Sequence, residues 1–155
     1  MDMKYCILIF LLFFMFPYSG IAQAYWFYQQ GEEYFYGIGE RKQSYEKAFL
    51  LYIKAADKGS PDAEYKISVC YHNGYGVEQS DRKAFLWAKK AAKHGSAQSQ
   101  NAIGIYYYTG TGCTQSYARG IKWLTRSANR GNLEAIHNLE QIGGYPKIII
   151  QFPDE

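Results

Sequence analysis

Cysteine is scarce in this sequence, and charge of either sign is modest. Three cysteines in 155 residues are too few for a disulfide-held scaffold, in which Cys exceeds about 8–10% of a short secreted chain. The 17 Lys and Arg outnumber the 14 Asp and Glu by three, too small an excess to indicate a nucleic-acid groove. Because charged residues make up 20% and hydrophobic residues 48% of the chain, a disordered protein is excluded.

The sequence also lacks the motifs of common catalytic and metal sites. It contains no His-Glu-x-x-His, Cys-x-x-Cys or Gly-x-Ser-x-Gly, so neither a zinc site nor a serine nucleophile is indicated. Its Gly-x-Gly turns are not followed by Lys-Ser/Thr, which excludes a phosphate-binding loop. Glu32 and Glu33 are adjacent and point to different sides of a helix, so they do not form a catalytic pair. We therefore expect a protein that is not an enzyme and binds no cofactor or metal.

The first 24 residues have the pattern of a secretory signal peptide. Lys4 precedes an uncharged, almost wholly apolar run over residues 5–16, and Pro17 and the small-residue site Ala22-Gln23-Ala24 follow. We predict cleavage after Ala24. The alternative is an uncleaved anchor, but a membrane span needs about 20 predominantly apolar residues. No later apolar run approaches that length, so we expect a periplasmic or secreted protein with no stable span after cleavage.

The remaining sequence repeats every 36 residues. Glycines recur at this spacing, each after a pair of small residues and before a Ser or Asn: Gly59, Gly95 and Gly131. The same spacing separates Ser44, Ser80 and Ser116, and also Leu51, Trp87 and Trp123. An internal repeat of this length indicates a stacked array of like units.

Each recurring residue has a place in a helix hairpin. A Gly just past a helix adopts the left-handed conformation, and the Ser or Asn after it caps the next helix. The small residues let two helices approach closely, and the large ones fill the space between them. We expect first helices over 25–35, 61–73, 97–109 and 133–142, and second helices over 44–57, 81–93 and 117–129.

The predicted fold is all-α, a right-handed α-solenoid of three helix-turn-helix repeats plus a C-terminal capping helix. The array covers 25–142, with repeats at about 25–59, 60–95 and 96–131 and a cap at 132–142. Residues 143–155 leave the helical pattern, and Gly and Pro flank the β-branched run Ile148–Ile150. We expect this extended C-terminal tail to fold back over the last helix pair; the alternative is that it adds a strand to a partner.

The marked residues of the third repeat lie at the spacing of a known family. They are Ile103-Gly104, Tyr107, Gly110-Thr-Gly112, Lys122-Trp123 and Ser127-Ala128. The second repeat shares most of them, and the first repeat shares fewer. In these residues the sequence resembles the Sel-1-like repeat (SLR) family, which is related to the tetratricopeptide repeats. Gln30, where an aliphatic is usual, and Gly120, in place of a helix Ala, depart from the family pattern.

The resemblance implies a protein-binding adaptor whose partner lies against a concave face lined by first helices. The residues that this geometry places on the face are Tyr28, Glu32, Phe35, Tyr65, Val69, His72, Asn101, Ile105, Tyr108, His137 and Gln141. This set is aromatic and weakly charged, and Tyr is enriched at protein interfaces. The alternative is a surface that is merely aromatic; Tyr34, Tyr71 and Tyr107 are assigned by register to the core.

Two cysteines remain after signal cleavage, in a compartment that permits oxidation. Cys70 ends one first helix and Cys113 lies in the loop of the next repeat. A disulfide between them is possible if their Cα atoms lie within about 7 Å; the alternative is a pair of buried free thiols.

We therefore expect an exported protein–protein interaction module whose partner is another protein and not a nucleic acid. Because some small periplasmic members of the family neutralise toxins, the resemblance further implies a periplasmic immunity protein, or inhibitor, that binds a secreted toxin. One alternative is a scaffold of the cell envelope or membrane surface that uses the basic residues of 82–93. Another is an envelope hydrolase, for which the sequence shows no polar catalytic cluster.

Overall fold

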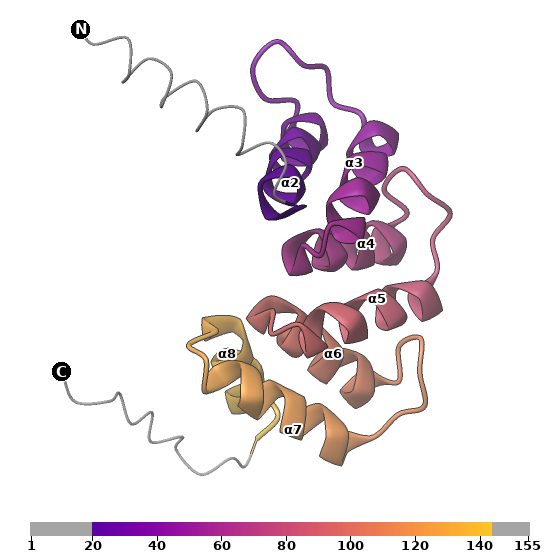
Figure 1. Ribbon diagram of the computed structural model, residues 1–155. Coiled ribbons are helices and arrows are strands. Elements are labelled where there is room, and N and C mark those ends of the chain that lie inside the picture. The colour runs from indigo at the N-terminus through magenta and orange to yellow at the C-terminus, as the bar shows by residue number, and fades with distance from the viewer. Residues whose placement is uncertain (1–19, 144–155) are drawn as a thin grey trace, which may run out of the picture. The chain divides into compact units, whose positions relative to one another are not determined.

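The computed structural model describes residues 20–143, which form seven α-helices (Figure 1). The first helices of the repeats are α2 (Gly20–Tyr36), α4 (Pro61–Asn73) and α6 (Ala97–Thr109). The second helices are α3 (Tyr45–Asp57), α5 (Asp81–Lys93) and α7 (Tyr117–Ala128), and α8 (Leu133–Gln141) follows them. No strand occurs within residues 20–143. The predicted all-α fold of helix-turn-helix repeats is confirmed.

Helices α3 to α8 begin and end within one residue of their predicted bounds because the predicted caps form. The hydroxyl Oγ of each capping serine accepts a hydrogen bond from a backbone N–H of the first turn, as Ser60 does from Ala63 at 3.2 Å. Asn132 does the same for α8, with its Oδ1 2.8 Å from the Ala135 nitrogen. Pro61 occupies the first position of α4, where a missing N–H leaves no hydrogen bond unmade.

Helix α2 begins at Gly20, five residues before the predicted start. Its first turn therefore includes residues 20–24, the end of the predicted signal peptide. The rest of that segment, residues 1–19, and all but Gly143 of the predicted tail at 143–155 lie outside the described residues. Within residues 20–143, no helix is long and apolar enough to span a membrane.

The core lies one residue away from the large side chains that the repeat pattern singled out. Leu51, Trp87 and Trp123 are half-buried. The next position in each repeat is fully buried, and it is occupied by Tyr52, Ala88 and Leu124. Tyr107 is buried as predicted, but Tyr34 and Tyr71 are only half-buried. The small pairs at 55–56, 91–92 and 127–128 are buried throughout, as the close approach of two helices requires.

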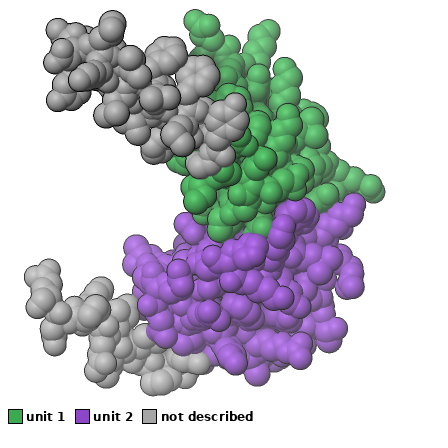
Figure 2. All heavy atoms as spheres, viewed as in Figure 1, with its two compact units in different colours: residues 1–79 green, residues 80–155 purple. Residues whose placement is uncertain are grey.

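The chain divides into two compact units, Met1–Gln79 and Ser80–Glu155 (Figure 2). The boundary falls in the loop between α4 and α5, inside the second repeat. In the first unit, α3 packs against both α2 and α4. In the second unit, α6 packs against α5 and α7, and α8 packs against α7. Leu124 and Ala128 of α7 and Ala135 and Leu139 of α8 form a buried cluster that holds α8 in place.

Two glycines let α6 and α7 pack with their backbones close together. A Cβ added to Gly120 would lie 2.9 Å from the carbonyl oxygen of Gly104 and 3.0 Å from the Cβ of Tyr108. A Cβ added to Gly104 would lie 2.7 Å from Cγ of Leu124. Gly120, which departs from the family's usual Ala, is therefore explained by this contact.

A glutamine closes each helix-turn-helix loop. The Nε2 of Gln43 donates to the carbonyl oxygen of Phe35 at 2.9 Å, and Gln79 does the same to His72 at 2.8 Å. Gln115 repeats the bond to Tyr108 at 2.9 Å. Each acceptor lies in the last turn of a first helix, where carbonyl groups lack an intrahelical partner. The three glutamines lie 36 residues apart, so this bond is a feature of every repeat.

Candidate functional site

In the first unit, the predicted face residue Glu32 forms a polar cluster with α3 and α4. The Tyr52 hydroxyl donates to Glu32 Oε1, and Lys66 Nζ lies 2.9 Å from Glu32 Oε2. Lys66 Nζ also lies 3.5 Å from the Tyr36 hydroxyl and 5.4 Å from the centre of the Phe35 ring. The Lys66 and Glu32 side chains are only 16% and 20% exposed. Glu32 of α2 thus bonds to residues of α3 and α4, and both its carboxylate oxygens have a partner.

Burial and the Glu32 charge shift the titration of the groups around this cluster. Burial, reinforced by the negative charge of Glu32, raises the pKa of Tyr28 to about 12. Burial and the hydrogen bond to Glu32 raise the pKa of Tyr52 as well. Burial acts to lower the pKa of Lys66, but the hydrogen bond and charge of Glu32 outweigh it, so the pKa is raised. All three groups therefore keep their protons in the folded chain.

We expect the folding stability to fall as the pH rises from about 10 to about 12. The pKa of Tyr28 is about 12 in the folded chain against an ordinary value of 10.0. The unfolded chain loses the proton first, so the stabilisation is complete below pH 10 and disappears as the pH passes 12. Urea unfolding at pH 8 and pH 11 measures the loss, which should be smaller in Tyr28→Phe. Tyr25→Phe, at an exposed position of the same helix, is the control, and equal losses in both variants would contradict the assignment.

Phe35 of the predicted face belongs to an aromatic cluster at the loop end of the first unit. Its ring centre lies 4.9 Å from that of Tyr36, 5.1 Å from Tyr45 and 5.5 Å from Tyr75. Tyr45 and Tyr75 stack on each other at 4.6 Å. Because these residues come from α2, from α3 and from the loop after α4, the cluster joins the first two repeats. Phe35 is half-buried, and its main contacts are internal.

The other predicted residues of the first unit are spread over a range of exposure. Tyr28, Tyr65 and Val69 are half-buried, whereas His72 is exposed. Tyr28 lies beside Tyr52, with 6.0 Å between the ring centres. The first unit therefore presents parts of these side chains at its surface.

In the second unit, Asn101 is withdrawn from the surface by an amide network. Its side chain is 5% exposed. Its Nδ2 lies 3.2 Å from Glu134 Oε2, and its Oδ1 accepts from Asn138 Nδ2 at 2.9 Å. Asn101 thus positions α8 against α6, and Asn138 of α8 takes the surface position.

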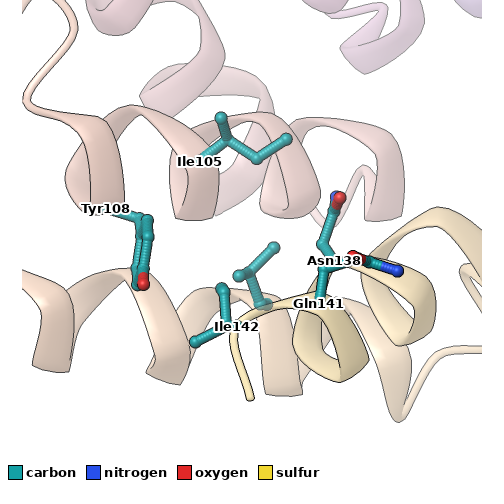
Figure 3. Close-up of a pocket in the computed structure, with 6 residues that line it drawn as sticks. Ile105, Tyr108, Asn138, Gln141 and Ile142 are labelled. Atoms are coloured by element: carbon teal, nitrogen blue, oxygen red, sulfur yellow. The ribbon is translucent and has the colours of Figure 1, made fainter.

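Beside this network lies a pocket of about 350 Å³. Figure 3 shows Ile105 and Tyr108 entering it from α6, and Asn138, Gln141 and Ile142 from α8 and the residue after it. Leu124 of α7 completes the lining. Ile105 is 37% exposed, and the Tyr108 ring packs edge-on against Tyr117 at 4.9 Å. All six side chains are uncharged, so the pocket combines apolar walls with two amides and one phenol.

The structure brings three of the predicted residues together in this pocket: Ile105, Tyr108 and Gln141. Asn138, Ile142 and Leu124 were missed. His137 was predicted instead of Asn138; it is exposed and does not line the pocket. The helix period contains the signal that would have corrected this, because Ala135 and Leu139 face the core and residues 134, 138 and 141 then share the adjacent face.

The described residues show no arrangement suited to metal binding, and neither cysteine lines the pocket. Within residues 20–143, no three His, Cys, Asp or Glu side chains could share a metal ion. Cys70 and Cys113 form no disulfide in the structure. Because they belong to different units, a bond between them stays a prediction. Burial raises the pKa of Cys70 to about 12. The Sγ of Cys113 lies 3.4 Å from the carbonyl oxygen of Tyr106.

Comparison with solved structures places the chain among helical repeat proteins. It is similar to c5321, a protective antigen present in uropathogenic Escherichia coli strains that displays an SLR fold, with 32% identity and a TM-score of 0.71 over 79% of this chain and 25% of that one. It is also similar to a Sel1 repeat protein from Oxalobacter formigenes, with 26% identity and a TM-score of 0.70 over 80% and 49% of the two chains. The chain therefore spans a quarter to a half of the length of these two proteins.

A third structure supports the fold alone. Helicobacter pylori cysteine rich protein B is 22% identical, with a TM-score of 0.57 over 60% of this chain and 70% of that one. No curated protein sequence matches this chain. The family model described as Sel1 repeat matches residues 21–60, 61–96 and 97–132. These three matches span most of the sequence, and the chain belongs to the Sel1 repeat family.

Proposed function

We propose that this chain is an exported interaction module that binds another protein through the pocket between α6 and α8, and that it acts in the periplasm as the inhibitor of a secreted toxin. Sel1 repeat proteins are protein–protein interaction modules and are typically not enzymes. Membership of the family therefore supports binding in general. The periplasmic location, the toxin as partner and the pocket as binding site go beyond family membership and are our proposal.

The pocket is the observation on which the binding site rests. Its volume, about 350 Å³, lies at the lower end of the range of ligand pockets and suits one or two side chains of a partner. Ile105, Ile142 and Leu124 offer an apolar floor, and Asn138 and Gln141 offer amides that can both donate and accept hydrogen bonds. A protein segment with one apolar side chain between two backbone amide groups matches this lining in shape and in polarity.

The proposed toxin and compartment rest on the sequence. The predicted signal peptide favours export. An inhibitor needs only to cover a functional surface of its target, which an uncharged pocket flanked by Tyr108 does without any chemistry of its own. The same features make an envelope scaffold the main competing function.

Co-purification from the producing cell tests the binding site. We expect one stoichiometric protein partner to be captured. The double variant Ile105→Glu with Tyr108→Ala should retain at least tenfold less of this partner than the unchanged chain. Leu50 is an exposed leucine of α3 in the first unit (60% exposed) and does not line the pocket. Leu50→Glu introduces the same charge and should retain the partner. If the double variant keeps its helical circular dichroism and still binds, the pocket is not the site.

Co-expression tests the toxin. The captured protein, sent to the periplasm without this chain, should arrest growth, and exporting the chain should restore it. The Ile105→Glu, Tyr108→Ala variant should not protect. A partner that is harmless in the periplasm, or protection that persists when the signal segment is deleted, would overturn the inhibitor function and leave the binding site intact.

A further inference from the structure

Charge is distributed unevenly between the two units. Among the described residues, the second unit has nine Lys and Arg and three Asp and Glu, a balance of +6. The first unit has six Lys and Arg and eight Asp and Glu, a balance of −2. The modest charge of the whole chain therefore conceals a strongly basic second unit.

The positive charge of the second unit lies on its second helices. Helix α6 contains no charged residue, and α7 contains no acidic residue. The single acidic residue of α5 is Asp81, in its first turn. Seven exposed cations lie on α5 and α7, and we call them the basic face: Arg82, Lys83, Lys90, Lys93, Arg119, Lys122 and Arg126. The helical spacing of Lys83, Lys90 and Lys93 keeps them on one side of α5.

An aromatic pair connects the basic residues of the two helices. Lys89 lies 5.8 Å from the centre of the Phe85 ring, and Arg119 lies 5.7 Å from that of Tyr107. The Phe85 and Tyr107 rings are themselves 5.2 Å apart in an edge-to-face contact. A cation of α5 and a cation of α7 thus lie against the same pair of rings, Phe85 and Tyr107. The positive potentials of the two helices add at this pair.

Apolar and tryptophan side chains lie among these cations. Leu86 is 52% exposed between Lys83 and Lys90. Lys90 Nζ lies 4.8 Å from the centre of the half-buried Trp87 ring, and the Arg126 guanidinium lies 5.5 Å from that of Trp123. Tryptophan beside Lys and Arg is typical of surfaces at the level of lipid head groups. An acidic protein surface would match the positive charge but would offer no apolar contact for the exposed Leu86.

We propose that the basic face of α5 and α7 binds the surface of a bilayer containing anionic phospholipids. Lys and Arg would lie among the phosphates, and Leu86 would reach the boundary with the acyl chains. This binding is independent of the proposed partner pocket, because the basic face is formed by second helices and the pocket by α6, α8 and Leu124. The chain would then bind its partner protein while attached to a membrane surface.

Vesicle flotation of the full chain after signal cleavage tests the proposal. The probes are vesicles of phosphatidylcholine alone and of phosphatidylcholine with about one third phosphatidylglycerol. We expect binding to the anionic vesicles only, and weaker binding as salt is raised. Lys83→Gln with Lys90→Gln should reduce the affinity about ten- to thirtyfold, since each cation near an anionic surface contributes about fivefold.

The first unit offers a matched control. Lys47, Leu50 and Lys54 occupy the same repeat positions on α3 as Lys83, Leu86 and Lys90 on α5, but exposed Glu46 and Asp57 accompany them. Lys47→Gln with Lys54→Gln makes the same change of charge and should leave vesicle binding within about twofold. Gln is as good a helix former as Lys, so both variants should keep their circular dichroism.

Three results would overturn the proposal. The first is no binding to anionic vesicles at low salt. The second is an equal loss of binding in the α5 and α3 variants, which would mean that net charge alone is responsible. The third is binding to a polyglutamate peptide in place of vesicles, which would identify an acidic protein as the ligand. Loss of the protein partner in the pocket variant has no bearing on any of them.

Discussion

Replacing Gly112 by Ala is expected to lower the free energy of unfolding by about 3–5 kcal/mol. The φ angle of Gly112 is +68°, and a Cβ built there would lie 2.1 Å from the carbonyl oxygen of Asp81, at the start of α5. The left-handed backbone accounts for about 1–2 kcal/mol. The remainder arises because the atom in the way is backbone, so the loop or the first turn of α5 must move. For a small domain with about 5–15 kcal/mol of stability, this is a large part of the free energy of unfolding.

Gly39→Ala is the matched control for this prediction. Gly39 occupies the equivalent position of the first repeat with a φ of +70°, and no described atom lies within 4 Å of its added Cβ. It therefore experiences the backbone strain without the collision, and about 1–2 kcal/mol is expected. Urea unfolding followed by circular dichroism compares the two variants. Equal effects would show that conformation alone explains Gly112 and that the loop does not press on α5.

Glu32→Gln is expected to destabilise the chain by about 2–3 kcal/mol at pH 7. The substitution keeps the shape of the side chain but removes the negative charge 2.9 Å from Lys66 Nζ. Lys66 is left as a largely buried cation, and removing one member of a buried pair costs about 3–5 kcal/mol; the residual exposure of this pair lowers the expected figure. Thermal or urea unfolding measures the change.

The neighbouring residue provides the comparison. Glu33 pairs with Arg41 at 3.0 Å, but the Arg41 and Glu33 side chains are 34% and 37% exposed, and exposed pairs contribute about 0–1 kcal/mol. Glu33→Gln should therefore change the stability by less than about 1 kcal/mol. Combining Glu32→Gln with Lys66→Met should recover part of the loss, because no uncompensated charge remains. A double variant whose loss is the sum of the two single losses would contradict the coupling.

The sequence predicts the helices of this protein well because each boundary has its own chemical mark. Ser80 precedes α5, Gly74 follows α4, and Pro61 can stand only near a helix start, so local chemistry places these ends without knowledge of packing. The 36-residue spacing then supplies three independent copies of the same information. The all-α repeat fold follows from these residues alone.

The site was harder to predict because it depends on one-residue differences in helix rotation. Leu51, Trp87 and Trp123 are the conspicuous large residues, yet the fully buried position is the next one. His137 was expected on the partner face and Asn138 lines the pocket. The first difference comes from following the large residues that recur in the sequence. The second comes from transferring offsets to the chain in place of fitting the apolar residues of each helix.

Glu32 shows a further limit, since sequence alone does not reveal which polar residues are paired. A Glu on the expected face suggested a binding residue, but its partners Tyr52 and Lys66 are 20 and 34 residues away. Only the packing of α2, α3 and α4 brings them together. The same holds for Asn101, whose hydrogen-bond partners Glu134 and Asn138 lie on α8.

The glycine loops determine where such a chain tolerates changes of length. Gly76 and Gly112 fit against the backbone at the start of the preceding second helix, so an insertion beside either of them would displace two repeats at once. The loop after Gly39 is one residue longer than its counterparts, and no described atom lies within 4 Å of a Cβ added to Gly39. We therefore expect this loop to tolerate insertions and deletions better than its counterparts, and a protein engineer adding a repeat ahead of α2 would first have to shorten it.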